Sequence, residues 1–215
     1  QEAGGAGNDT LIRIEGLYGS NFADTLSGSD GNDFLDGGLG DDVIDGASGR
    51  DVVTYSSAPA AVTVSLALSG PQDTHSAGSD NLTNIEDLEG SAFDDVLTGD
   101  NRANEISGYL GNDTLVGADG KDLLRGWAGN DSLAGGAGDD SLFGGTGNDI
   151  FDGGDGIDEV SYELAASAVT VNLGLATPQN TGGEGSDSMV GIEALTGTLY
   201  NDTLLGGTDN ELLDG

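Results

Sequence analysis

Aspartate recurs at a fixed nine-residue spacing in the middle of this chain. From Gly108 to Ser161 the sequence divides into six consecutive units, GYLGNDTLV, GADGKDLLR, GWAGNDSLA, GGAGDDSLF, GGTGNDIFD and GGDGIDEVS. Each unit has Gly at its first and fourth places, Asp at its sixth and an apolar residue at its eighth. A carboxylate is the hard anionic oxygen ligand that calcium prefers. A carboxylate at every ninth residue of a glycine-rich chain therefore predicts a row of calcium sites.

The same frame covers three runs, Gly19 to Thr54, Gly90 to Ser161 and Gly197 to Asp214, with 14 units in all. The first place is always Gly, the eighth is always apolar, and the sixth is Asp except at Asn104 and Glu211. A solvated acidic surface would explain the charge but not this register. The sixth-place candidates are Asp24, Asp33, Asp42, Asp51, Asp95, Asp113, Asp122, Asp131, Asp140, Asp149, Asp158 and Asp202.

Turns and very short strands must position these carboxylates. We expect the first six places of a unit to form a tight turn, where Gly supplies positive φ and lets backbone carbonyls face inward. The last three places predict a strand whose middle residue points into the interior. Two units then make one coil of 18 residues, and coils stack at roughly 4.7–4.9 Å. The pattern predicts an all-β parallel β-roll, a β-solenoid whose coils are held by their neighbours and by metal.

Two spacers of 35 residues, 55–89 and 162–196, separate the runs and are copies at a constant offset of 107. Residues 1–18 match the tail of a third copy. Alternating stretches, AVTVSL and AVTVNL, predict strands with one buried face. We expect each spacer to continue the coil with wider turns, so that residues 1–215 form one elongated domain.

The first unit after each spacer has an aromatic residue at its fourth place, namely Phe22, Phe93 or Tyr200. An aromatic side chain cannot serve a tight turn as Gly does, so we expect it to pack over the last loop of the spacer. The array also stops within a unit, at Gly215, without a polar cap. We therefore expect the chain to be a segment of a longer protein.

Composition bounds the partners. The formal charge is −34, with 39 acids against five Lys and Arg, which makes nucleic acid an implausible partner. Such charge opposes compaction, so the chain should be loose without calcium and compact with it. There is no Cys for a disulfide or thiolate site, and no apolar stretch reaches membrane-spanning length.

The units resemble the GGxGxDxUx nonapeptide of the repeats-in-toxin (RTX, hemolysin-type) family of secreted bacterial proteins, over nearly the whole chain. The resemblance implies a calcium-stabilised parallel β-roll in which calcium lies between turns one coil apart. Its ligands would be the sixth-place carboxylates and backbone carbonyls. The fourth-place glycines implied are Gly31, Gly40, Gly49, Gly111, Gly120, Gly129, Gly138, Gly147 and Gly156.

Carried onto this sequence, the resemblance pairs acids 18 residues apart and implies about seven calcium ions or more. The pairs are Asp24–Asp42, Asp33–Asp51, Asp95–Asp113, Asp113–Asp131, Asp122–Asp140, Asp131–Asp149 and Asp140–Asp158. Asn104 opposite Asp122 would be a weaker eighth site. A carbonyl-rich cage favours calcium over magnesium, which demands octahedral geometry and keeps its waters.

The sequence departs from the family pattern at several turns. The second place holds Ser29, Ala47, Tyr109, Ala118 or Trp127 instead of Gly, which makes the geometry of those turns less regular. At fourth places, Arg102 and Asp209 predict poorer binding turns. In the spacers, Asp9, Asp80 and Asp187 occupy matching places, and the sequence leaves open whether they are ligands.

The resemblance implies a calcium-binding structural and folding module of a large secreted or cell-surface bacterial protein, an adhesin or exoprotein, exported by type I secretion. The alternative is the accessory module of an extracellular protease, lipase or alginate epimerase whose catalysis lies elsewhere in the chain. We expect no enzyme here, because the lone histidine, His75, has no evident nucleophile partner. We expect a monomer that joins flanking domains of the same polypeptide. A sugar-stacking surface at Tyr109 and Trp127 is a further possibility, with polysaccharide or a cell surface as partner.

Overall fold

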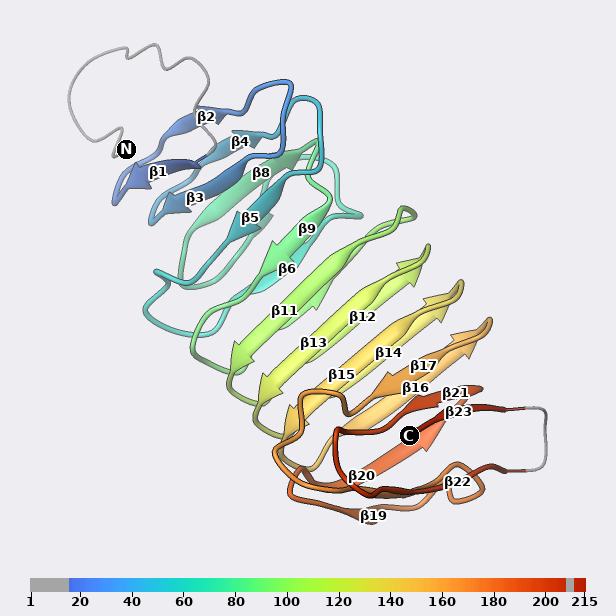
Figure 1. Ribbon diagram of the computed structural model, residues 1–215. Coiled ribbons are helices and arrows are strands. Elements are labelled where there is room, and N and C mark those ends of the chain that lie inside the picture. Colours follow the sequence, from blue (N-terminus) through green and yellow to red (C-terminus); the bar gives the residue numbers. More distant parts are fainter. Residues whose placement is uncertain (1–15, 208–210) are drawn as a thin grey trace.

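The protein forms an elongated stack of parallel coils (Figure 1). The structure, a computed structural model, describes residues 16–207 and 211–215, and in these ranges it contains strands and turns but no α-helix. Consequently no helix that could cross a bilayer occurs among the described residues. The predictions for Asp9 and Asp209 concern residues outside these ranges. An all-β, mostly parallel roll is thus confirmed as the fold.

One long sheet follows the whole roll and receives every second unit. Its ten strands, in spatial order, are β1 (Gly16–Ser20), β3 (Phe34–Gly38), β5 (Val52–Thr54), β9 (Asp87–Glu89), β11 (Glu105–Leu110), β13 (Leu123–Ala128), β15 (Ser141–Thr146), β17 (Glu159–Ser161), β21 (Ala194–Thr196) and β23 (Leu212–Asp214). All neighbours in this sheet are parallel.

The opposite side of the roll is divided into three sheets, and the divisions fall at the spacers. The first contains β2 (Thr25–Ser27), β4 (Val43–Asp45), β8 (Ser79–Thr83) and β7 (Gln72–Asp73). The second contains β6 (Thr63–Ser65), β10 (Val96–Thr98), β12 (Thr114–Asp119), β14 (Ser132–Ala137), β16 (Ile150–Asp155), β20 (Gly185–Val190) and β19 (Gln179–Gly182). The third contains β18 (Thr170–Asn172) and β22 (Thr203–Leu205).

The register within the repeat runs is 18 residues, as the nonapeptide pattern predicts. In the second run Leu115 lies beside Leu133, which in turn lies beside Phe151. The central strands have six residues instead of the predicted three, because they continue into the first places of the next unit. The longer strands still present the eighth-place residue to the interior.

Besides apolar spacer residues such as Val64 and Leu88, the core consists of two files of eighth-place side chains, one from each side of the roll. Twelve of them are at most 3% exposed: Leu26, Leu35, Ile44, Val53, Leu97, Ile106, Leu115, Leu124, Leu133, Leu142, Phe151 and Val160. In the last coil, Leu204 is only partly buried and Leu213 is 39% exposed. One side chain per unit is a thin core, so backbone pairing between coils and the turns themselves must supply much of the stability.

Each spacer continues the coil on the ten-stranded side but doubles back on the other side. β5 pairs directly with β9 across the first spacer, as wider turns would predict. On the opposite side, however, β6 stacks on the later strand β10, whereas β8, which follows β6 in sequence, stacks on the earlier strand β4. β7 pairs with β8 in the antiparallel sense. The expectation of simple wider turns is therefore wrong for this side.

A glutamine side chain joins the two sheets at each of these breaks. In the first spacer the Ser65 N–H donates to Oε1 of Gln72 (2.8 Å), and Nε2 of Gln72 donates to the Ser65 carbonyl (3.0 Å). Asn172 and Gln179 repeat both bonds in the second spacer, at 2.7 and 3.1 Å. The primary amide thus makes the two hydrogen bonds that a neighbouring strand would make.

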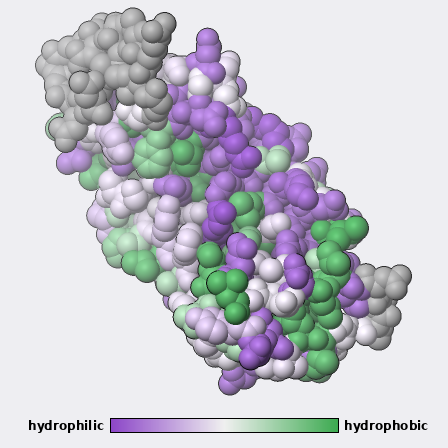
Figure 2. All heavy atoms as spheres, in the orientation of Figure 1, coloured by the Kyte–Doolittle hydropathy of each residue, from purple (hydrophilic) through white to green (hydrophobic). Residues whose placement is uncertain are grey.

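The fourth-place aromatics after the spacers are not packed away. Phe22, Phe93 and Tyr200 are 79%, 42% and 55% exposed. The prediction that they cover the last spacer loop is therefore wrong. Figure 2 shows a largely hydrophilic surface, with apolar side chains gathered mainly toward the C-terminal end.

Candidate metal centre

The sixth-place aspartates form two files at the turns, one along each edge of the roll. Each residue directly precedes a strand; Asp113, for example, precedes β12 and Asp122 precedes β13. Ten of the twelve predicted residues are at most 3% exposed, and Asp24 and Asp202, near the two ends, are half-buried. Carboxylates this deeply buried need a compensating partner.

Eight of these carboxylates are held by the backbone of the preceding coil. The N–H of Asp113 donates to Oδ1 of Asp131 at 2.8 Å, and the N–H of Asp131 donates to Oδ1 of Asp149 at 2.9 Å. The same bond, always across 18 residues, joins Asp24 to Asp42, Asp33 to Asp51, Asp95 to Asp113, Asn104 to Asp122, Asp122 to Asp140 and Asp140 to Asp158. We call these two series of bonds the carboxylate ladders.

The second carboxylate oxygen of the interior residues is left without a donor. Within the described residues, Oδ2 is buried and accepts no hydrogen bond in Asp42, Asp51, Asp113, Asp122, Asp131, Asp140, Asp149 and Asp158. These are the later members of the seven pairs predicted from the sequence and of the weaker eighth pair. A buried anionic oxygen without a partner is unfavourable unless a cation compensates it.

Glycine at the first place makes room for this oxygen. In all twelve units with a sixth-place Asp, a Cβ on the first-place Gly would lie at most 3.0 Å from Oδ2 of that Asp. None of these first-place glycines has a φ in the left-handed region. The invariant Gly is therefore explained by the carboxylate, and not by the positive φ that the sequence analysis assigned to the turn as a whole.

Positive φ belongs instead to the second and fourth places. Eight of the nine predicted fourth-place glycines have φ between 122° and 155°, Gly31 being the exception. At Gly129, Gly138 and Gly147, the atom nearest to an added Cβ would be the carbonyl oxygen of the fourth-place Gly one coil earlier. The carbonyl oxygens of successive fourth-place turns thus lie one above another along the roll.

This set of donor atoms suits calcium better than it suits a metal that is bound by side chains alone. Among the described residues, no three His, Cys, Asp or Glu side chains converge on one point. An ion here must therefore combine carboxylate oxygens with backbone carbonyls, which are the ligands that suit calcium and its flexible coordination number. When bound, calcium would supply the positive charge that the orphaned oxygens lack. Which residues act as ligands, and at how many sites, remains a prediction.

Burial changes the acidity of the ladder carboxylates. It raises the pKa of Asp113 and Asp149 to about 7, and that of Asp42, Asp122 and Asp131 to about 6. The backbone N–H donor partly opposes this shift in each residue, and neighbouring carboxylates add to it in Asp113 and Asp149. The same cause raises the pKa of Asp51, Asp95, Asp140 and Asp158.

The spacer aspartates continue a ladder, but hydroxyl groups occupy their second oxygen. Oδ1 of Asp80 accepts the N–H of Asp42 at 3.0 Å. Its Oδ2 accepts the hydroxyls of Tyr55 (3.1 Å) and Thr74 (3.3 Å). Asp187 repeats this arrangement with Asp149, Tyr162 and Thr181 at 3.0, 2.7 and 2.9 Å. These two carboxylates therefore do not share the orphaned oxygen of the repeat units.

The other ladder passes through two glutamates that the sequence analysis did not propose as ligands. The N–H of Asp51 donates to Oε2 of Glu86, and the N–H of Asp158 donates to Oε2 of Glu193, both at 3.0 Å. The signal that could have found them is the copy offset of 107, which aligns Glu86 with Glu193 and Tyr55 with Tyr162.

Hydroxyl residues at the second place donate to the aspartate of the first unit after each spacer and of one further unit, which begins at Gly28. Ser91 donates its N–H (2.5 Å) to Oδ2 of Asp95 and its hydroxyl (2.9 Å) to Oδ1. Ser29 and Thr198 do the same for the Asp of their own units, and Ser20 donates both its N–H and its hydroxyl to Oδ2 of Asp24. Ser29, a departure from the family pattern, is thus a hydrogen-bond donor to its site.

Comparison with known proteins agrees with the repeat frame. A family model described as RTX calcium-binding nonapeptide repeat (4 copies) matches residues 3–12, 18–53, 89–124, 98–133, 125–160 and 189–215. Most of each spacer lies outside these matches. A search of curated proteins gave no match.

The ladder predicts that one aspartate serves two sites. Asp131→Asn should remove two calcium ions per chain, because Asp131 accepts from the turn before it and donates to the carboxylate after it. Native mass spectrometry at saturating calcium gives the count. Asp152→Asn, an equal change of charge at an exposed ninth-place residue, is the control and should remove none. Loss of one ion or of none in Asp131→Asn would show the pairing scheme to be wrong.

The raised pKa values predict opposite pH trends with and without calcium. A carboxyl group of pKa about 6 to 7 in the fold, against about 3.9 in the unfolded chain, stabilises the protonated fold. In chelator, β-structure should therefore decrease as the pH rises from about 4 to about 7. In calcium it should decrease as the pH falls, because protons then compete for the ligands. Far-UV circular dichroism follows both trends, and a chelated fold that strengthens toward pH 7 would contradict the assignment.

Proposed function

Because the chain belongs to the RTX calcium-binding nonapeptide repeat family, we propose that it is a folding and stiffening segment of a larger secreted or cell-surface bacterial protein, of the adhesin or exoprotein kind. The observation that carries the proposal is the set of eight orphaned carboxylate oxygens among the described residues, one for each bonded pair of sixth-place residues 18 apart. Cations would neutralise these oxygens, and the elongated roll would then act as a stiff rod.

The magnitudes favour folding that depends on calcium. An unpaired buried ion carries a penalty of roughly several kcal/mol, whereas a domain is stable by only about 5–15 kcal/mol in total. Eight ionised oxygens of this kind would exceed the stability of most domains. The net charge of −34 adds general repulsion. The metal-free chain at neutral pH is therefore expected to be largely unfolded.

Calcium then acts as a signal of location. Extracellular calcium modules typically bind with Kd of about 10⁻⁴ to 10⁻³ M. Affinities in that range would leave the chain unfolded in a bacterial cytosol and fold it in calcium-rich medium. We propose that folding after type I export makes the export directional. Its partners would be calcium and the flanking domains of the same polypeptide, and the segment itself would be monomeric.

The alternative is an accessory module of an extracellular enzyme, with the catalytic part elsewhere in the polypeptide. We propose that this segment itself catalyses nothing. The single histidine, His75, lies on an exposed turn, and its backbone N–H donates to Oδ1 of Asp73. The ladders account for the buried sixth-place aspartates. Flanking sequence separates the two proposals, since a catalytic motif would favour the enzyme and further arrays or adhesion domains would favour the adhesin.

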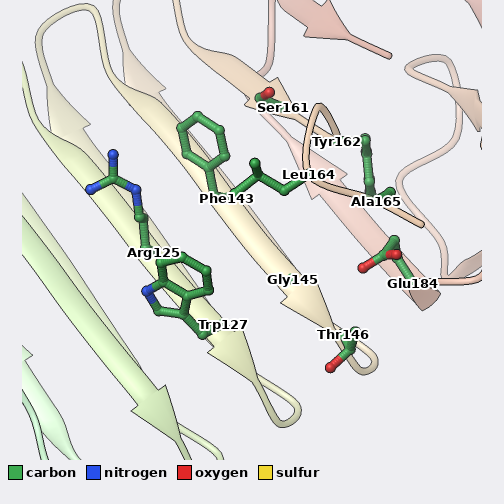
Figure 3. Close-up of a pocket in the computed structure, with 10 residues that line it drawn as sticks. All are labelled: Arg125, Trp127, Phe143, Gly145, Thr146, Ser161, Tyr162, Leu164, Ala165 and Glu184. Atoms are coloured by element: carbon green, nitrogen blue, oxygen red, sulfur yellow. The ribbon is translucent and has the colours of Figure 1, made fainter. Parts of the chain in front are cut away.

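A pocket on the ten-stranded side favours a second function, the binding of a neutral polysaccharide. Trp127 and Phe143 lie on neighbouring strands, and Leu164 reaches over from the second spacer (Figure 3). The depression has a volume of about 140 Å³, with Arg125 and Glu184 also lining it. Next to it, the rings of Trp127 and Tyr109 are parallel within 6° with centroids 6.5 Å apart. Flat aromatic surfaces with polar groups at the rim suit the apolar faces of sugars.

The fold itself does not require these apolar residues. At the matching places of the first copy, 107 residues earlier, Trp127, Phe143 and Leu164 are replaced by Ser20, Asp36 and Ser57. Trp127 also has φ of 76°, a left-handed conformation that is costly for a bulky side chain. Since Arg125 already pairs with Glu105 and the chain is strongly acidic, a neutral glycan fits better than an anionic one.

Calcium titration of the chelated protein tests the first proposal. Far-UV circular dichroism should show a cooperative gain of β signal with calcium and none with magnesium at the same concentration. A complete fold in chelator at pH 7.5 would contradict calcium-driven folding and would assign the stability to the spacers.

Affinity electrophoresis tests the second. Calcium-loaded protein should be retarded in gels that contain a neutral β-glucan and not in gels that contain alginate. Trp127→Ala should abolish the retardation, because it removes the largest of the aromatic side chains that line the pocket. Phe22→Ala, which removes an exposed aromatic far from the pocket, is the control and should change nothing. Unchanged mobility of the wild-type protein in a panel of neutral glycans would overturn this proposal.

A further inference from the structure

The ladder on the ten-stranded side has one turn whose charges differ from all others in the second run. Here the sixth-place residue is Asn104, which is neutral, and the fourth-place residue is Arg102, whereas the later units of this run have Gly there. The preceding coil contributes Glu86, and the following coil contributes Asp122. Glu86 and Asn104 are 18 residues apart, the spacing at which the resemblance pairs two carboxylates around an ion. Here the second carboxylate is replaced by the neutral amide of Asn104.

The guanidinium of Arg102 contacts the groups that would otherwise surround an ion. It forms an ion pair with Oε1 of Glu86 and donates to the carbonyl of Ile85 at 2.7 Å. It also donates to Oδ2 of Asp100 at 2.9 Å. Two carboxylates and a backbone carbonyl are the ligand types that calcium takes, but here a side chain of the protein meets them.

In Asn104, both polar side-chain atoms have hydrogen-bond partners, so its oxygen is not orphaned at this turn. Its Oδ1 accepts the N–H of Asp100 at 2.8 Å, and its Nδ2 donates to the carbonyl of Glu86 at 2.7 Å. The amide therefore donates toward the preceding coil, where the ladder aspartates accept. Asn104 is as buried as those aspartates but has no orphaned atom among the described residues.

From these contacts we infer that Arg102 is a resident cation, which takes the place of calcium between Glu86 and Asn104. This turn then closes without metal, and the weaker eighth site predicted for Asn104 and Asp122 is limited to the coil contact on the far side of Asn104. The inference concerns one turn and holds whatever the role of the chain in secretion.

The second copy provides an internal contrast in sequence. At the places 107 residues after Arg102 and Asn104, the chain has Asp209 and Glu211. The exchange turns one positive and one neutral residue into two acids. A resident cation is therefore a property of the first copy, and the repeat architecture does not demand it.

The count of bound calcium tests the inference directly. Arg102→Gly combined with Asn104→Asp restores the repeat pattern, and native mass spectrometry at saturating calcium should show one more ion per chain than in the wild type. Arg125→Gln, which removes an arginine of the same sheet that pairs with Glu105 away from the turns, should leave the count unchanged. An unchanged count in a folded double variant would overturn the inference. A wild-type count of zero would instead overturn calcium binding itself, so the two failures are distinguishable.

A single substitution covers the case in which the double variant does not fold. Arg102→Gln removes the cation without supplying a ligand, so the calcium midpoint of folding, followed by circular dichroism, should shift upward relative to Arg125→Gln. Equal midpoints for the two single variants would show that Arg102 acts only as a surface charge.

Discussion

The bond from each sixth-place N–H to the carboxylate one coil later is the constraint on which the roll depends. It fixes the 18-residue register, because the donor and the acceptor must lie in consecutive coils. It also brings the carboxylate inside the turn, where Oδ2 lies against the first-place Gly. The invariant glycine, the buried acid and the need for a cation are three results of one hydrogen bond. A strand core of one side chain per unit could not impose this order alone.

The chain satisfies the buried carboxylates in different ways along its length. In the repeat runs the second oxygen is left for calcium, whereas in the spacers the hydroxyls of Tyr55 and Tyr162 donate to it. At the first coil contact after the spacer, Arg102 provides a fixed positive charge. The spacer aspartates therefore have donors from the protein itself, and they separate the runs of coils that carry orphaned oxygens.

Sequence alone predicts the parts of this structure that repeat. The nine-residue frame predicts the coil length, the buried file of Leu and Phe, and the two files of aspartates, because each follows from a local pattern repeated many times. It does not predict that β6 pairs with the later strand β10 while β8 pairs with the earlier strand β4. This order depends on pairing between strands far apart in sequence. It also explains the first-place Gly by backbone conformation. The true reason is the carboxylate of the same unit, which lies against that Gly only in the folded turn.

The doubled path of the spacers affects how the roll would respond to a pulling force. In the repeat runs each coil is bonded only to its two neighbours, so a force at one end peels coils away one after another. At a spacer, one stretch of chain is bonded both to the earlier strand β4 and to the later strand β10, and Gln72 ties the two halves together. Peeling must there break two contacts at once. We therefore expect the spacers to resist unfolding under force more than the repeat runs do. The number of units between two spacers would then set how far the rod extends before the next resistant point.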